Sequence, residues 1–169
     1  YYSDINIEIN KKVNKNVRYN AVIANQTYNK DFLEGKTPGE YGVLNSTIAV
    51  LDLSYRIKKG HTIRFETQAL FSKQLETASK EAEGDWLMAL AEYTISPNWF
   101  FAIQDMYNYG NENESKRLHY MNLNVGFLKG STRFEIGYGK KREGIFCVGG
   151  VCKLVPSSNG LNLSITTSF

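Results

Sequence analysis

Cys147 and Cys152 are the residues whose spacing most directly predicts a chemical bond. Gly149 and Gly150 lie between them and suit a two-residue hairpin turn. The cysteines would then face each other as a non-hydrogen-bonded pair with Cα atoms ~4.5 Å apart, the close end of the range that a disulfide accepts. A disulfide needs an oxidising compartment, such as the periplasm or the cell surface. Zinc binding is the rival use, but no third or fourth ligand lies nearby in the sequence, so we predict the disulfide.

The two histidines are the other candidates for catalysis. His61 falls in a short turn and His119 at the start of a strand, and the strand order described below places them at opposite ends of a sheet. A hydrolase would need a serine beside a histidine with an orienting partner, and Ser115 with His119 is the only sequence-local candidate. The sequence has no Walker-type loop, no G-x-G-x-x-G motif and no CxxC pair. We therefore expect no enzymatic activity and no cofactor.

One polar loop segment contains oxygen ligands of the kind that calcium prefers. Asn111 to Glu114 could bind this ion weakly through amide and carboxylate oxygens. A solvated loop accounts for the same residues, and we predict no metal site.

The composition excludes several classes of protein. The 20 lysines and arginines against 17 acidic residues give a net charge of +3, which is too balanced for a typical nucleic-acid-binding surface. The longest apolar run, Trp86 to Ala91, is far shorter than the ~18 residues of a membrane-spanning helix. With 42% apolar and 13% aromatic residues, the chain has enough apolar surface to fold. We expect a folded protein without a membrane-spanning helix and without a nucleic-acid partner.

Apolar and polar residues alternate with a period of two in nearly every segment, which predicts β-strands with one apolar and one polar face. In segment 62–72, for example, Ile63 and Phe65 lie on the side opposite Arg64. The register of segment 99–109 stays open, because Asp105 falls on its apolar side. The class is therefore all-β, with about nine strands, at 5–10, 17–28, 43–57, 62–72, 86–95, 99–109, 119–127, 132–139 and 160–169.

The connections between these strands are alternately short and long. Those at 11–16, 58–61, 96–98 and 128–131 are short, whereas those at 29–42, 73–85, 110–118 and 140–159 are long and polar. An up-and-down antiparallel sheet with this asymmetry resembles a transmembrane β-barrel of a bacterial outer membrane, with tight turns inside and longer loops outside. Apolar faces would contact lipid and polar faces would line the lumen. The lumen-lining side chains predicted in this way include Arg64, Glu66, Gln68, Asn122, Asn124, Arg133 and Glu135.

Aromatic residues near the strand ends fit the two interfacial girdles of such a barrel. The alternative is that they form the core of a soluble sandwich. The aromatic residues assigned to the two girdles are Tyr1, Tyr2, Tyr28, Tyr41, Trp86, Trp99, Phe100, Tyr107, Tyr109 and Tyr120.

The final predicted strand, 160–169, alternates along its whole length, with Leu161, Leu163, Ile165 and Phe169 on one side. This pattern resembles the assembly signal of outer-membrane barrels. In that family, the insertion machinery recognises by edge pairing a terminal phenylalanine preceded by apolar residues at every second position. An ordinary edge strand is the alternative, but chain ends usually fray.

The stretch from Cys147 to Phe169, CVGGVCKLVPSSNGLNLSITTSF, resembles the closing segment of a family of uncharacterised outer-membrane barrels from Bacteroidota. The resemblance implies a location and an architecture but no reaction. Members of that family look longer, and a complete single-chain barrel has an even number of strands. We therefore expect residues 1–169 to be the C-terminal portion of a larger barrel domain, incomplete at its N-terminus, unless a partner chain supplies the missing strand.

Two functions follow from this architecture. The first is a porin-like channel for ions or small solutes, with selectivity set by the lumen residues. The second is a non-conducting scaffold barrel that docks partner proteins in an outer-membrane complex. A soluble, lipocalin-like ligand binder is a third reading. We expect a multi-pass protein of the cell outer membrane with a periplasmic C-terminus, whose partners are membrane lipid, the barrel assembly machinery during insertion and other outer-membrane proteins.

Overall fold

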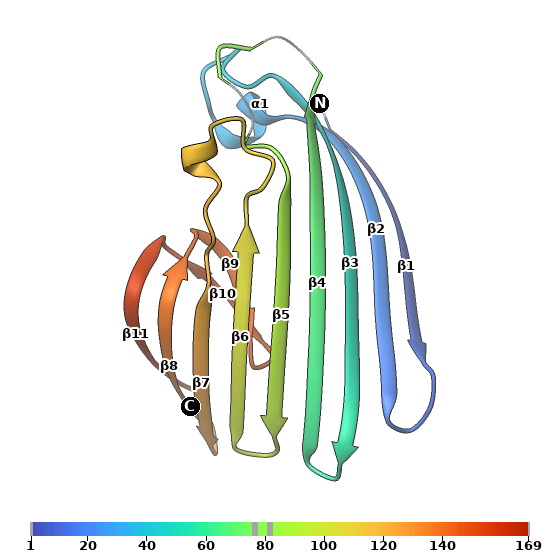
Figure 1. Cartoon of the computed structure of the whole chain (residues 1–169), viewed down its shortest axis with the longest axis vertical. Coiled ribbons are helices and arrows are strands. Elements are labelled where there is room, and N and C mark those ends of the chain that lie inside the picture. Colours follow the sequence, from blue (N-terminus) through green and yellow to red (C-terminus); the bar gives the residue numbers. More distant parts are fainter. Residues whose placement is uncertain (1, 76–77, 81–82, 169) are drawn as a thin grey trace.

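The computed structural model describes residues 2–75, 78–80 and 83–168. Nine strands form one antiparallel sheet in which each strand pairs with the next in sequence up to β8, which pairs with β11 (Figure 1). Strands β1 and β11 lie at the two edges of this sheet, which is not closed. The fold is therefore an all-β, up-and-down antiparallel sheet, as the sequence predicts. The nine strands are β1 (Tyr2–Lys12), β2 (Val17–Asn29), β3 (Val43–Lys58), β4 (His61–Gln74), β5 (Trp86–Ile95), β6 (Trp99–Tyr107), β7 (Asn122–Lys129), β8 (Thr132–Lys141) and β11 (Ser158–Thr167).

Short turns and long connections lie at opposite ends of the sheet. The turns that follow β1, β3, β5 and β7 gather at the bottom of Figure 1, and we call this the tight-turn end. The longer connections gather at the top, which we call the loop end. The predicted alternation of loop lengths is confirmed.

The strand predicted to begin at His119 begins later in the structure. This residue forms only an isolated bridge to Tyr107, and β7 begins later, at Asn122. The register of β6 places Asp105 opposite Ala89, on the same side of the sheet as the apolar residues that precede it. His119 contacts it there, with 2.7 Å between His119 Nδ1 and Asp105 Oδ2.

Two short strands, β9 (Gly144–Val148) and β10 (Val151–Val155), form a separate hairpin between β8 and β11. Figure 1 shows this hairpin behind β5, β6 and β7, outside the nine-stranded sheet. The hairpin turn that the sequence predicts at Gly149 and Gly150, within the connection 140–159, is confirmed. The packing of this hairpin against the sheet was not predicted, and it arises because Phe146 and Val148 give the hairpin an apolar side.

The helices are short and lie in the long connections. Helix α1 (Lys30–Glu34) begins at Asn29, whose side chain caps it, and ends at Gly35, which has a left-handed φ of 63°. A single 3-10 turn, η1 (Glu114–Lys116), follows β6. Across the described ranges, no helix has the length and apolar character needed to cross a membrane.

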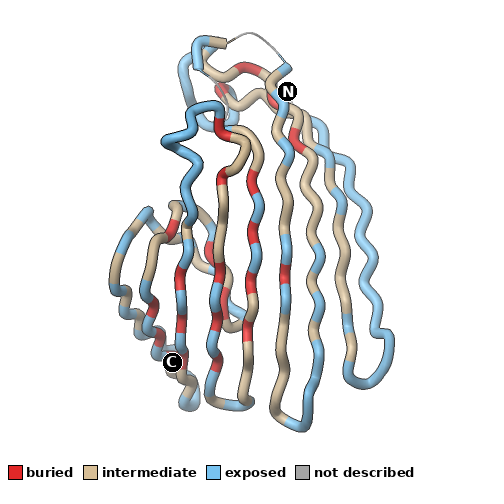
Figure 2. The backbone as a smooth tube through the Cα atoms, viewed as in Figure 1, coloured by how far each residue is buried: buried red, intermediate tan, exposed pale blue. Residues whose placement is uncertain are grey.

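On β7 and β8, burial alternates in the opposite sense to that of a water-soluble sheet, whereas β5 and β6 bury mainly apolar residues on the same face. On β7, Leu123 is 52% exposed, whereas its polar neighbours Asn122 and Asn124 are 3% and 2% exposed. Figure 2 shows the same alternation of buried and exposed positions along β5 to β8. We call the face with the buried polar residues, against which the hairpin packs, the inner face, and the other the outer face.

A small apolar cluster joins the hairpin to the inner face. Phe146 and Val148 of β9 pack against residues of β5 and β6. Phe100 is the centre of this contact, and Gly126 on β7 leaves room for its ring, since a Cβ there would lie only 1.9 Å from a ring carbon. The sheet members of the cluster are Met88, Leu90, Phe100 and Ala102.

Two residues of the predicted aromatic girdles lie on the inner face instead. Phe100 and Trp86 are 1% and 7% exposed and belong to the inner face, so neither lies at an outer interface. Trp99 lies one position from Phe100 on the outer face and is 43% exposed. Tyr1 lies outside the described residues.

Candidate functional site: a polar inner face and its hairpin

Arg64, Glu66 and Gln68 lie at alternate positions of β4 and form one hydrogen-bonded chain. The guanidinium of Arg64 bonds to the carboxylates of Glu66 and of Asp52 on β3, and Gln68 Nε2 donates to Glu66. Glu66 is directly opposite Leu90, which belongs to the cluster beneath the hairpin. These three predicted lumen residues therefore share the inner face.

Asn122, Asn124, Arg133 and Glu135 bring the same polar character to β7 and β8. Asn124 Nδ2 donates to Asn122 Oδ1 over 2.6 Å, and both amides are buried. Arg133 Nη2 lies 3.3 Å from Glu135 Oε2. All seven residues of the predicted set thus lie on one face, in two groups rather than in one contiguous site.

Arg133 also holds the turn of the β9–β10 hairpin. Its Nη1 donates to the carbonyl of Gly149 over 2.9 Å, and its Nη2 to that of Val148 over 2.8 Å. From the other side, Glu92 Oε2 accepts the Gly149 N–H over 2.6 Å. Gly149 has a φ of +57°, and a Cβ there would come within 2.7 Å of Arg133 and of Phe100, so the turn requires glycine for conformation and for space.

Further charged contacts fix the hairpin along its length. Lys153 Nζ on β10 lies 3.2 Å from Glu135 Oε2. The ammonium group of Lys141 lies 4.3 Å from the ring centre of Phe146. Both strands of the hairpin are therefore anchored to β8.

The predicted disulfide is confirmed. Cys147 and Cys152 are direct partners in the hairpin, and their sulfur atoms are bonded, with 4.0 Å between the Cα atoms. Gly149 and Gly150 form the turn with φ values of 57° and 74°, the positive values that a type I′ turn needs. The bond closes the hairpin on the side opposite Phe146 and Val148.

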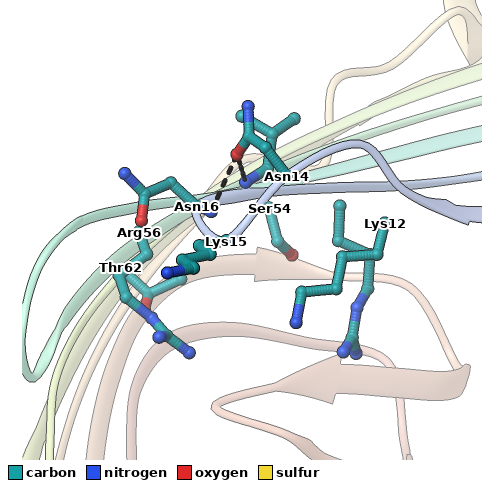
Figure 3. A pocket seen from close by; sticks show the side chains of 9 residues that line it. Lys12, Asn14, Lys15, Asn16, Ser54, Arg56 and Thr62 are labelled. Atoms are coloured by element: carbon teal, nitrogen blue, oxygen red, sulfur yellow. Dashed lines mark hydrogen bonds between the residues drawn. The ribbon is translucent and has the colours of Figure 1, made fainter.

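A basic hollow lies at the tight-turn end (Figure 3). It has a volume of about 280 Å³, and Lys12, Lys15, Arg18 and Arg56 contribute to its wall. The turn is shaped by Asn14, whose Oδ1 accepts from the backbone N–H groups of residues 16 and 17. This hollow was not predicted, although lysine and arginine are concentrated in and beside the short turns of the sequence.

A larger cavity of about 550 Å³ lies at the loop end. Trp86 and Tyr120 form part of its wall, together with Asn108 and Lys116. The Oδ1 atom of Asn108 is buried and has no hydrogen-bond partner among the described residues. This cavity gives the inner face a polar opening at the loop end.

Asp31 organises the first loop of that end. Its carboxylate accepts the backbone N–H groups of Gly39, Tyr41 and Gly42 over 2.8–3.0 Å. Burial works against the charged form, but these hydrogen bonds outweigh it and hold the pKa of Asp31 below its ordinary value. The segment from 30 to 42 is therefore tied to an ionised carboxylate.

Lys80 links the second long loop to the first. Its Nζ donates to Glu40 Oε1 over 2.6 Å, and this hydrogen bond lowers the pKa of Glu40 and raises the pKa of Lys80. The backbone N–H groups of Ser79 and Lys80 donate to the carbonyls of Gly39 and Glu40. The two loops thus form one docked unit.

The histidines make unrelated contacts. His61 Nδ1 lies 2.6 Å from the hydroxyl of Tyr93 near the tight-turn end. His119 contacts Asp105 and stacks on Tyr107, with 4.0 Å between ring centres. Ser115, the serine near His119 in the sequence, instead donates from its Oγ to Asn113 Oδ1. The structure therefore does not assemble a Ser–His pair, and no cluster of three potential metal-ligating side chains occurs in the described part of the chain.

The residues of the predicted assembly signal lie on the outer face of β11. Leu161, Leu163 and Ile165 are 68%, 70% and 71% exposed. Asn162 and Ser164, between them, are half-buried on the inner side. Phe169 lies outside the described residues.

Comparison with known proteins gives a family but no activity. The model of a family of unknown function (DUF6029) matches residues 1–169. No curated protein and no solved structure matches the chain. Because the match spans the whole sequence, the chain belongs to this family of unknown function, DUF6029.

Proposed function

We propose that this chain forms the wall of an integral outer-membrane β-barrel that passes ions or small polar solutes. The observation that carries the proposal is the burial of polar residues on the inner face of β7 and β8, together with the exposure of apolar residues on the outer face. The proposal supposes no catalytic step.

The composition of the outer face favours contact with lipid. Large apolar side chains stay exposed there on every strand of the nine-stranded sheet, among them Ile7, Leu53, Phe65, Ile103 and Leu163. Burial of apolar surface is worth roughly 25 cal/mol per Å², and monomeric proteins in water rarely expose apolar patches larger than a few hundred Å². Acyl chains would cover this face without a second sheet.

The strand lengths also fit a membrane. The strands of the sheet have between 8 and 16 residues, and about 9–11 tilted residues cross a bilayer. Tight turns at one end and long connections at the other match the periplasmic and outer sides of bacterial barrels. In this orientation, the C-terminus is periplasmic and β11 carries the signal that the barrel assembly machinery reads.

The two free edges require partners in a bilayer. Backbone groups of β1 and β11 would otherwise lack hydrogen bonds within the hydrocarbon layer, where no water can replace them. We propose that further strands, joined to these two edges, close the wall. A barrel larger than the nine described strands leaves space in the lumen beside the hairpin.

A non-conducting scaffold is the second candidate, and the hairpin favours it. Packing of Phe146 and Val148 on the inner face fills part of the interior next to β5 and β6. If the closed barrel is small, this hairpin plugs it, and partner proteins would then dock on the outer loops or the lipid-facing wall.

Planar-bilayer recording on the full-length protein separates these functions. Stepwise openings that persist under constant voltage, and that the same protein denatured beforehand does not give, support the channel. Absence of conductance by protein that is folded and inserted into the bilayer supports the scaffold. Recovery of folded, monodisperse protein in buffer without detergent would overturn both, because the outer face would then have to pack against protein.

A further inference from the structure

The charges of this chain are distributed very unevenly between the two ends of the sheet. No acidic residue occurs in segments 9–20, 55–63, 94–101 or 127–132, which form the tight-turn end. The modest net charge of +3 therefore conceals a strongly basic end. Its basic residues are Lys11, Lys12, Lys15, Arg18, Arg56, Lys58, Lys59 and Lys129.

Part of this charge belongs to the inner face. Lys12 on β1 pairs in register with Arg18 on β2, and Arg18 pairs with Ser54 on β3. Ser54 pairs in turn with Arg64, and Arg64 with Glu92, which accepts a hydrogen bond from the hairpin turn. The hollow lined by Lys12, Arg18 and their basic neighbours is therefore the tight-turn mouth of the inner face (Figure 3).

The basic side chains at this mouth differ from those deeper on the inner face. Arg64 is paired with Asp52, and Arg133 with Glu135. Within the described chain, Lys12, Lys15, Arg18 and Arg56 form no ion pair. Like charges gathered around one hollow repel one another and concentrate counter-ions. This hollow therefore attracts anions.

We propose that the basic hollow is an anion site that makes the pore selective for small solutes carrying a phosphate or carboxylate group. This inference rests on the proposed channel. Guanidinium groups bind phosphate and carboxylate oxygens through paired hydrogen bonds, and lysine adds a flexible point charge. Rings of arginine and lysine select anions in pores in the same way. The hollow faces the interior, so it takes a dissolved anion rather than a lipid headgroup.

The test uses reversal potentials of the full-length protein in bilayers of phosphatidylcholine under a KCl gradient. We expect a chloride-to-potassium permeability ratio on the order of 10 at low salt. In the triple variant Lys12→Gln, Arg18→Gln, Arg56→Gln, we expect this ratio to fall to on the order of 1. The matched control, Lys58→Gln, Lys59→Gln, Lys129→Gln, removes as many charges from the same end but none from the wall of the hollow.

Each outcome distinguishes the inference from the channel itself. A conducting wild type that prefers potassium, or a control variant that loses as much selectivity as the hollow variant, overturns the anion site and leaves the channel standing. If the inserted protein does not conduct, the channel fails. Calorimetric titration of the protein in phosphatidylcholine nanodiscs with inorganic phosphate then tests anion binding by the hollow independently of conduction. Binding that disappears only in the hollow variant supports it, and absence of binding by the wild type overturns it.

Discussion

The Nη1 atom of Arg133 on β8 lies 2.9 Å from the carbonyl oxygen of Gly149, in the turn of the β9–β10 hairpin. This contact joins the wall of the sheet to the element that fills part of its inner face. The same guanidinium lies 4.2 Å from the ring centre of Phe100, which lies beside the hairpin turn. Arg133 is therefore the principal link between hairpin and wall.

Replacement of Arg133 should release the hairpin. We expect Arg133→Ala to cost about 3 kcal/mol of unfolding free energy in detergent, because Glu135 and two turn carbonyls lose their buried partner. Single-channel conductance should rise, since the turn no longer occupies the interior. Lys129→Ala, an exposed change at the tight-turn end, should alter neither quantity. An Arg133→Ala protein with the conductance of the wild type would contradict this role for the hairpin.

The disulfide should be present in the mature protein and should stabilise the hairpin. Alkylation of the unreduced, denatured protein should leave both cysteines unmodified in the mass spectrum. Because Cys147 and Cys152 are separated by 5 positions, the closed loop is short, and Cys147→Ser with Cys152→Ser should cost about 2 kcal/mol. Two alkylated thiols in protein isolated from cell envelopes would contradict the assignment.

Gly126 should tolerate no side chain while Phe100 is present. A Cβ at this position would overlap the Phe100 ring, so we expect Gly126→Ala to destabilise the protein by about 1–3 kcal/mol in urea unfolding. Phe100→Leu should make the same alanine much less costly, because a smaller side chain vacates the space. If the cost of Gly126→Ala is identical in both backgrounds, the ring does not occupy this position.

The first loop should loosen in acid. The pKa of Asp31 is lowered in the folded protein, so its contribution to loop stability is complete above the ordinary aspartate pKa of about 3.9 and is lost as the pH falls through the lowered value. The amide signals of Gly39 and Gly42 in NMR spectra should therefore titrate together below about pH 3.9.

A variant tests the same carboxylate at neutral pH. Asp31→Asn should make trypsin cleave faster after Lys36, because an amide cannot accept from all three N–H groups as strongly. Glu34→Gln, an exposed change in the same helix, is the matched control. Equal cleavage rates in the two variants would show that Asp31 does not order the loop.

The sequence predicted those features that depend on local pattern. Alternation along each segment is enough to identify a strand and its polar side, which is why Arg64 and Asn124 could be assigned to one face. The glycine pair at 149–150 likewise predicted that the two cysteines face each other, because turn geometry acts over a few residues.

The features that were missed depend on long-range packing. Glu92 and Gly149 are 57 positions apart, and nothing in either segment specifies that they meet. The pairing of Phe100 with Gly126 depends on the register of β6 and β7, and the long connection between them leaves this register free. Arg18 and Arg56 share the basic hollow for the same reason, since only the sheet brings their turns together.

The contact of the outer face with lipid is the central claim, and the two tryptophans test it most directly. Trp99 lies on the outer face, whereas Trp86 is buried on the inner side. In vesicles of brominated lipid, the fluorescence of Trp99, measured in a Trp86→Phe background, should be strongly quenched. Trp86, measured in a Trp99→Phe background, should be quenched little. Equal quenching of the two, or a Trp99 that brominated lipid does not quench, would contradict the account.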